Sequence, residues 1–176
     1  MTSLPSAMGG VDGPKARTPS RARLKSAFAL ACWLALCFSA AAFGGLFGPS
    51  EWYAKLNKPA WNPPGWVFGP VWGALYTMMA VAAWLVWRRG GFRARRVPLG
   101  FFLSQLLFNA LWSPAFFGLR NPGLAFADIA LLWSLVLVTV VSSWRVRPLA
   151  GALLAPYLAW VSFAAALNLA IWSLNS

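Results

Sequence analysis

The sequence contains no histidine, only three acidic residues and only two cysteines among its 176 residues. Cys32 and Cys37 would lie about 140° apart around one helix of 3.6 residues per turn, which excludes a disulfide within that helix. Two thiols without histidine do not make a zinc site, and the commonest protein ligand of haem iron is missing. The sequence therefore predicts no metal site.

Residue sets for hydrolytic or nucleophilic catalysis are missing as well. There is no acid pair, no histidine base and no glycine-rich phosphate loop. We therefore predict no catalytic residue and no required cofactor, and we favour a non-enzymatic role.

What the sequence has in excess is apolar side chain. The chain is 60% hydrophobic and only 10% charged. The core of a soluble domain of this length cannot bury so much apolar side chain. A lipid bilayer is the solvent that removes this difficulty, so we expect an integral, multi-pass membrane protein. The net charge of +12 resembles that of a nucleic-acid-binding protein. However, the basic residues cluster between apolar segments, and no nucleic-acid partner is expected.

Five apolar runs are each close to the ~20 residues that a helix needs to cross the hydrocarbon core. Asp128 is the only charged residue inside them, and the interior prolines Pro114 and Pro156 predict kinks. The predicted fold class is an all-α membrane protein, a bundle of five transmembrane helices. The runs are Ala27–Phe47, Pro70–Trp87, Pro98–Leu119, Pro122–Trp144 and Pro148–Leu174.

Residues 1–25 are rich in proline, glycine, serine and basic residues and have almost no large apolar side chain. We interpret them as a disordered basic tail that precedes a membrane domain over residues 26–176. The alternative for the first apolar run is a cleaved signal peptide ending near Ser39. The length of the run favours an uncleaved helix.

The distribution of basic residues predicts the orientation. Five crossings place twelve basic residues, in the tail, in Arg88–Arg96 and at Arg145 and Arg147, on one side of the membrane. Only Lys55, Lys58 and Arg120 fall on the other side. This asymmetry predicts a cytoplasmic N-terminus.

The first loop, residues 48–68, combines four Trp and Tyr residues with Pro59, Pro63 and Pro64. We name it the aromatic loop. One interpretation is an interfacial belt, in which aromatic rings lie at the level of the lipid headgroups. The other is a lid over the bundle, which the length of the loop favours.

Polar residues inside the helices gather in the half of the membrane below this loop. Asn109, Ser113 and Asn168 lie there, and Asp128 lies roughly 9 Å into the fourth helix. Polar groups turn away from lipid toward a bundle or cavity, so we expect a partly polar cavity rich in tryptophan. Asn109 and Ser113, one turn apart, could donate hydrogen bonds to Asp128. The alternatives are that Asn109 and Asp128 only join helices and that the tryptophans only pack.

The motifs at these positions resemble those of the TspO/MBR family, which includes translocator proteins and tryptophan-rich sensory proteins. WYAKLNKPAWNPPGWVFGPVWGALY at Trp52–Tyr76 carries the resemblance, with PLGFFLSQLLFNALWSPAFFG at Pro98–Gly118. AFADIALL around Asp128 and PYLAW followed by ALN at Pro156–Asn168 extend it. The resemblance implies a TspO-like five-helix bundle, usually a homodimer, with a ligand pocket beneath the first loop.

Family ligands include porphyrins such as protoporphyrin IX, synthetic aromatic carboxamides and, in animals, cholesterol. Helix five here lacks the tyrosine and basic residue of the cholesterol motif, and that motif class is weak. The ligand implied is thus an apolar aromatic molecule, with protoporphyrin IX the leading candidate. The ligand-binding residues implied by matching positions are Trp52, Tyr53, Trp72, Asn109, Trp112, Ser113, Leu124, Ala127, Asp128, Leu131, Trp160, Ala164 and Leu167.

Three functions are compatible with this resemblance. The first is a porphyrin-binding sensor or regulator with a pocket inside the bundle. The second is an enzyme that degrades bound porphyrin with light and oxygen. The third is a carrier of porphyrin-like or sterol-like ligands, although five helices without an inverted repeat give little support for alternating access.

Overall fold

The computed structural model describes residues 19–176, and within this range it contains helices and no strand. Five helices are long and apolar enough to cross a membrane, as judged by length and composition. The predicted class, an all-α bundle of five membrane-spanning helices, is confirmed. These helices are α1 (Pro19–Gly45), α3 (Phe68–Trp87), α5 (Arg96–Ser113), α6 (Pro122–Val146) and α7 (Pro148–Leu174).

The helices form a closed ring in the order α1, α3, α7, α6, α5. Each helix packs against its two neighbours in this order, and α5 closes the ring by packing on α1. The α6–α7 pair is joined tightly, because Arg147 alone separates the two helices. At Gly151 a Cβ atom would lie 2.6 Å from the Trp144 ring, so only glycine allows this approach.

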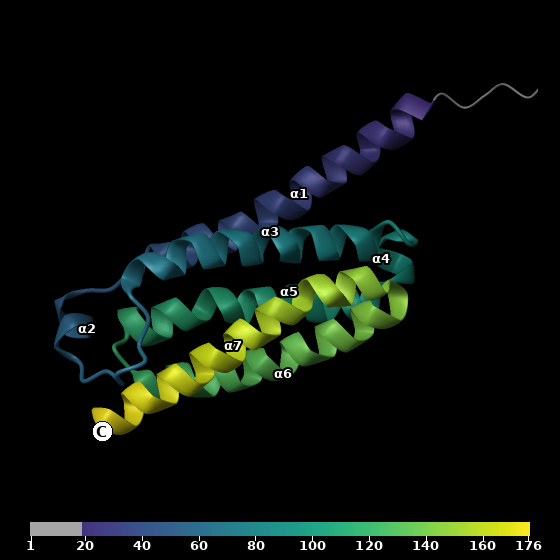
Figure 1. Ribbon diagram of the computed structural model, residues 1–176. Helices are drawn as coiled ribbons and strands as arrows, with labels where there is room; N and C mark the ends of the chain where they lie inside the picture. The colour runs from purple at the N-terminus through teal and green to yellow at the C-terminus, as the bar shows by residue number, and fades with distance from the viewer. Residues whose placement is uncertain (1–18) are drawn as a thin grey trace, which may run out of the picture.

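The two ends of the bundle differ in their connections. One end, which we name the loop end, carries the aromatic loop, the α5–α6 connection and the C-terminus (Figure 1). The loop contains the short helix α2 (Glu51–Lys55) and a 3₁₀ turn, η1 (Gly65–Val67). The opposite, basic end carries α4 (Gly91–Ala94), with its flanking arginines, and the α6–α7 connection.

Helix α1 begins earlier than the sequence indicated. It starts at Pro19, so residues 19–25 of the segment predicted to be disordered are helical, whereas residues 1–18 lie outside the described residues. The start of α1 diverges from the bundle (Figure 1). Leu24 and Phe28 are more than 70% exposed there. Arg, Ala, Leu and Lys favour helix, so local propensity supports this segment, and Trp84 Nε1 donates to the Ser26 carbonyl at 2.9 Å.

Proline has different effects at different positions. Pro122 and Pro148 each begin a helix, as expected, but α3 and α5 begin two residues before Pro70 and Pro98. Pro114 lacks an N–H group, and here α5 passes into a π-helical turn, η2 (Pro114–Gly118). The Leu119 N–H donates to the Pro114 carbonyl at 2.8 Å, which closes this wider turn. Pro156 lies inside α7, which continues through it.

Candidate ligand-binding cavity

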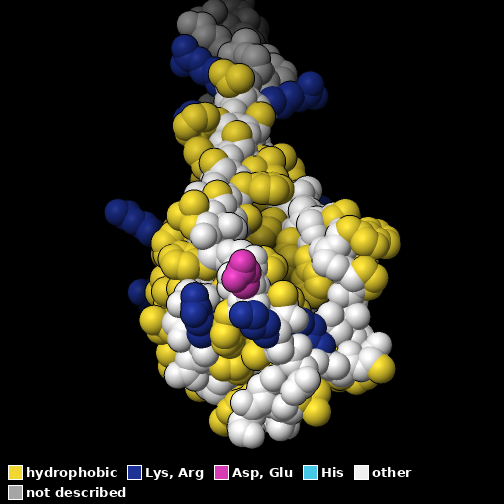
Figure 2. All heavy atoms as spheres, turned by 90° about the vertical axis from the view of Figure 1, so that its left-hand side faces the viewer, with side chains coloured by type: hydrophobic (Ala, Val, Ile, Leu, Met, Phe, Trp, Pro, Cys, Tyr) yellow, Lys and Arg dark blue, Asp and Glu magenta, His cyan; other side chains and the backbone are white. Residues whose placement is uncertain are grey.

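A cavity of about 630 Å³ lies inside the ring at the loop end, with contributions from all five long helices and the aromatic loop. Figure 2, which looks onto this end, shows a hollow lined by hydrophobic side chains. No residue in its lining is charged. The aromatic lining residues are Phe38, Phe47, Tyr53, Phe68, Trp72, Tyr76, Trp112, Phe116, Phe117 and Trp160.

The aromatic loop covers the cavity through ring contacts with η2 and α7. The Tyr53 ring lies edge-on to Phe117, with centroids 5.3 Å apart, and Trp52 packs on Phe116 at 5.9 Å. Further along the loop, Trp61 packs against Phe163 of α7 at 5.7 Å. These contacts hold the aromatic loop, whose only helical parts are the short elements α2 and η1, over the opening.

A reciprocal amide pair also fixes the loop to the end of α7. The Asn57 backbone N–H donates to Asn175 Oδ1 at 2.9 Å, and Asn175 Nδ2 donates back to the Asn57 carbonyl at 2.9 Å. Residues 118 positions apart in sequence are therefore joined twice. By contrast, Trp66 is 76% exposed, as expected of a ring that faces headgroups or water.

Tyr53 carries a phenol that burial keeps neutral. Removal from water raises the pKa of Tyr53 above its usual value of 10.0, because the phenolate would lose its hydration. The Lys58 ammonium lies 4.5 Å from the centre of the same ring, as a cation over its face. Tyr53 therefore presents an uncharged aromatic ring to the cavity throughout the neutral pH range.

Four buried polar side chains form a hydrogen-bonded chain at the deep end of the cavity, away from the loop. The Tyr76 hydroxyl donates to Asn109 Oδ1, and Asn109 Nδ2 donates to the Tyr157 hydroxyl oxygen at 3.0 Å. The Tyr157 hydroxyl in turn donates to Gln105 Oε1 at 2.9 Å. We name these four residues the polar chain; it joins α3, α5 and α7.

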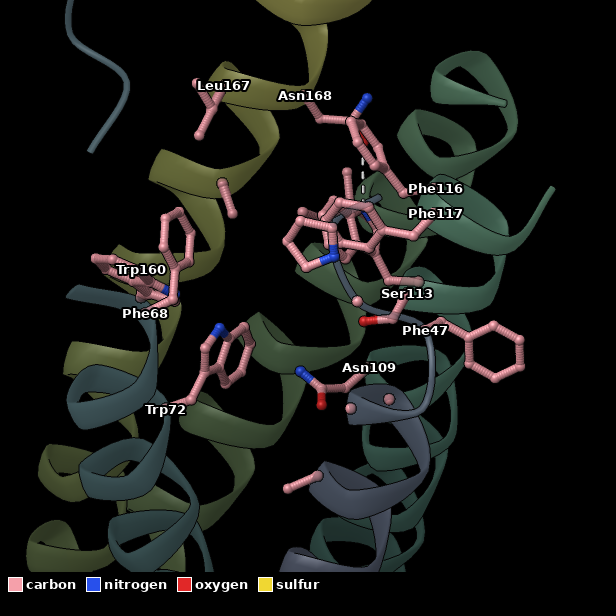
Figure 3. A pocket seen from close by; sticks show the side chains of 18 of the residues that line it. Phe47, Phe68, Trp72, Asn109, Ser113, Phe116, Phe117, Trp160, Leu167 and Asn168 are labelled. Carbon is pink, nitrogen blue, oxygen red and sulfur yellow. Dashed lines mark hydrogen bonds between the residues drawn. The ribbon is translucent and has the colours of Figure 1, made fainter. Parts of the chain in front are cut away.

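A second polar link joins α5, α6 and α7 nearer the loop. Trp112 Nε1 donates to Asn168 Oδ1 at 3.0 Å, and Asn168 Nδ2 donates to the Pro122 carbonyl at 2.8 Å. Figure 3 shows both levels, with Asn168 at the top of the cavity and Asn109 and Trp72 at the bottom. The Trp112 indole N–H and both the oxygen and the nitrogen of the Asn168 amide thus have hydrogen-bond partners, as polar groups within a membrane require.

The structure brings eight of the thirteen residues named from the sequence to the cavity wall. These are Tyr53, Trp72, Asn109, Trp112, Ser113, Trp160, Ala164 and Leu167. Trp52 lies behind the wall, against Phe116.

The four residues named on α6 lie elsewhere. The inward face of α6 carries Ala125, Ile129 and Leu132, whereas Leu124 and Leu131 are 47% and 46% exposed. Ala127 is exposed as well. A one-residue step of 100° around the helix therefore decides whether an α6 residue faces the cavity.

Asp128 is partly buried on α6 and does not line the cavity. The expected hydrogen bonds from Asn109 and Ser113 are wrong: within residues 19–176 the Asp128 side chain makes no hydrogen bond, and its Oδ2 atom is buried without a partner. The amide of Asn109 instead bonds with the hydroxyl groups of Tyr76 and Tyr157.

Several residues that line the cavity were not expected from the sequence. Tyr76 lies in an apolar stretch of sequence, so nothing around it distinguishes it from a core residue. Phe116 and Phe117 both line the cavity because the π-helical turn changes the angle between successive side chains. The cavity also takes Phe38, Ala41 and Gly44 from α1. They lie in an apolar run with few polar residues to mark the face that turns inward. Of these features, only the change of helical period after Pro114 has a signal in the sequence, namely the proline itself.

Together, the five spanning helices and the aromatic cavity define an integral membrane protein with a small-molecule cavity inside its helical bundle. The sequence model of the TspO/MBR family matches residues 33–173. The chain belongs to this family.

Among its relatives is the human translocator protein, which is 48% identical over 127 residues, 71% of this chain and 75% of the relative. The tryptophan-rich sensory protein of Cereibacter sphaeroides is 41% identical over 143 residues, 81% of this chain and 89% of the relative. The protein CrtK of Rhodobacter capsulatus is 38% identical over 149 residues, 82% and 91% of the two chains. The match to the family model, over residues 33–173, includes every residue that lines the cavity.

Proposed function

We propose that the protein binds a tetrapyrrole, with protoporphyrin IX as the leading candidate, in the cavity beneath the aromatic loop and acts as a sensor or regulator. The observation that carries this proposal is an uncharged cavity of about 630 Å³ with ten aromatic side chains in its wall. Flat apolar rings gain contact area and favourable ring–ring geometry in such a wall. The name of the bacterial relative, a sensory protein, supports the regulatory role.

Titration of the purified protein with protoporphyrin IX tests this proposal. In detergent micelles kept in the dark, we expect saturable quenching of tryptophan fluorescence. Trp160→Ala should weaken binding, because this ring lines the cavity, whereas Trp144→Ala at the basic end should not. Non-saturable partition, equal in both variants, would contradict a porphyrin site. Loss of the porphyrin spectrum only under light would indicate the degrading enzyme instead.

The aromatic loop is expected to contribute to affinity through Tyr53. Tyr53→Ala removes a ring that lines the cavity and contacts Phe117, so protoporphyrin should bind roughly 5-fold more weakly or worse, since a ring pair contributes about 1 kcal/mol beyond its buried area. The matched control is Trp66→Ala in the same loop, at an exposed position. Equal titration curves for the two variants would reduce the loop to an interfacial belt.

We also propose that the basic end faces the cytoplasm, because Arg88, Arg89, Arg93 and their neighbours gather there. Single cysteines at Ala94 and Ser176, in a chain with Cys32 and Cys37 replaced, should react with a membrane-impermeant maleimide from opposite sides. In intact cells only Ser176→Cys should be labelled, and Ala94→Cys only after permeabilisation. The reverse order would overturn the proposed orientation.

A further inference from the structure

The polar chain connects the cavity wall with the centre of the bundle. Tyr76 and Asn109 line the cavity, whereas Tyr157 and Gln105 are 0% exposed. All hydrogen bonds of the chain point in one direction, from Tyr76 inward to Gln105. The hydroxyl hydrogen of Tyr76 is therefore directed at Asn109, and the outer end of the chain offers the cavity only an oxygen lone pair.

The observed direction of the polar chain leaves a buried hydrogen-bond donor unpaired at its inner end. Gln105 Oε1 accepts from Tyr157, but Gln105 Nε2 is buried without a hydrogen-bond partner in the described part of the chain. An unpaired buried donor costs about as much as a lost hydrogen bond. Residues 19–176 contain only three buried side-chain atoms of this kind, and this one lies at the end of the polar chain.

Every member of the chain can both donate and accept. Hydroxyl hydrogens rotate freely, and an amide that turns over exchanges its oxygen and nitrogen without a change of shape. In the reversed chain Gln105 Nε2 donates to Tyr157, Tyr157 donates to Asn109, and Asn109 donates to the Tyr76 oxygen. Reversal thus gives Gln105 Nε2 a partner, leaves the Gln105 Oε1 acceptor unpaired in its place, and turns the Tyr76 hydroxyl hydrogen toward the cavity.

We propose that the polar chain reverses when a ligand presents a hydrogen-bond acceptor to Tyr76, so that the cavity selects flat ring systems with a carbonyl or similar acceptor at their deep end. This inference rests on the proposed ligand-binding role of the cavity. Without an acceptor, reversal leaves the Tyr76 hydrogen unpaired, and the observed direction is stable. With an acceptor, every hydroxyl hydrogen is paired in the reversed direction, so the ligand shifts the equilibrium by differential binding.

Gln105 makes the proposal specific, because it controls the direction of the chain without touching the ligand. Gln105→Met keeps the approximate volume but removes the acceptor that the Tyr157 hydroxyl uses in the observed direction. The hydroxyl of Tyr157 then finds an acceptor only in Asn109, which is the reversed direction. The variant should therefore bind ligands that carry an acceptor more tightly. If Gln105 only stabilised the fold, the substitution would weaken the binding of all ligands to the same extent.

Fluorene and fluorenone are suitable probes, because the two flat rings differ by a methylene group against a carbonyl. Their binding to the full chain in detergent gives an affinity ratio in which effects on ring packing cancel. We expect Gln105→Met to raise the preference for fluorenone roughly 5-fold, the equivalent of one hydrogen bond. Tyr76→Phe should remove the preference, and Tyr76→Phe combined with Gln105→Met should not restore it.

The infrared carbonyl band of bound ¹³C-labelled fluorenone provides the second measurement. It should lie below its position in an apolar solvent in the parent protein and return to that position in Tyr76→Phe. An unshifted band in the parent, or an affinity ratio that Gln105→Met leaves unchanged, would overturn the inference while the cavity still binds rings. If neither probe binds, the inference fails together with binding of small ring systems, whereas the protoporphyrin titration tests the proposed function separately.

Discussion

Phe116→Ala is expected to lower the free energy of unfolding by about 3 to 5 kcal/mol, the range for removing a large ring from a packed core. Phe116 is 1% exposed and lies at the centre of an aromatic cluster. Its ring stacks on Trp112 at 5.0 Å and contacts Trp52 and Tyr53 of the loop at 5.9 and 6.1 Å. The substitution therefore leaves a void and removes the surface on which the loop rests.

Thermal unfolding in detergent, followed by circular dichroism, measures this effect, and a protoporphyrin titration shows whether the loop still covers the cavity. Phe43→Ala is the matched control, since Phe43 is 42% exposed and packs only on Phe47 among the aromatic rings. We expect the control to melt within a few degrees of the parent. Equal melting of the two variants would show that the cluster does not hold the loop.

Asn109→Leu is expected to destabilise the bundle by about 1 to 3 kcal/mol, since it leaves the buried Tyr76 hydroxyl without its acceptor and the Tyr157 hydroxyl without its donor. Asn109 is 7% exposed, accepts from Tyr76 and donates to Tyr157, so it joins α3 and α7 through α5. Leucine has nearly the same volume but neither accepts nor donates. The melting temperature should fall. Porphyrin binding should weaken as well, because the hydrogen bonds that hold Tyr76 and Tyr157 at the deep end of the cavity are lost.

A double variant separates hydrogen bonding from packing. Adding Tyr76→Phe to Asn109→Leu removes the hydroxyl that the single variant leaves unpaired, so part of the lost stability should return. Ser104→Leu, at an exposed position of the same helix, is the control for added apolar volume. If the double variant melts below Asn109→Leu by the full effect of Tyr76→Phe alone, the two side chains are not coupled.

The gross architecture could be predicted from the sequence because it depends on local properties. Each spanning helix needs about 20 apolar residues, and the runs that satisfy this length fall within a few residues of α3, α6 and α7. The clusters of basic residues predict alternating sides for the same local reason. The start of α1 was missed, because a helix with good local propensity can extend beyond the membrane without any apolar signal.

The candidate site could be predicted only in part. Trp72, Asn109, Trp112 and Trp160 belong to the cavity wall, and their depth along each helix indicated the correct half of the membrane. Depth does not give the angle around the helix axis. Leu124 and Leu131 lie at the right depth but face away from the cavity.

The sequence by itself determined that the chain is an integral membrane protein with five spanning helices and that an aromatic loop follows the first of them. Tertiary structure decided which polar groups pair. Asn109 bonds with Tyr76 of α3 and Tyr157 of α7 across the inside of the ring. It does not bond with Asp128, although α6 adjoins α5, because Asn109 lines the cavity and Asp128 does not. Tertiary structure also decided that Phe116 and Phe117 both face inward, because a π-helical turn at Pro114 changes the helical period. Periodicity in a sequence fixes spacing along one helix, whereas the rotation of each helix is set only by its neighbours.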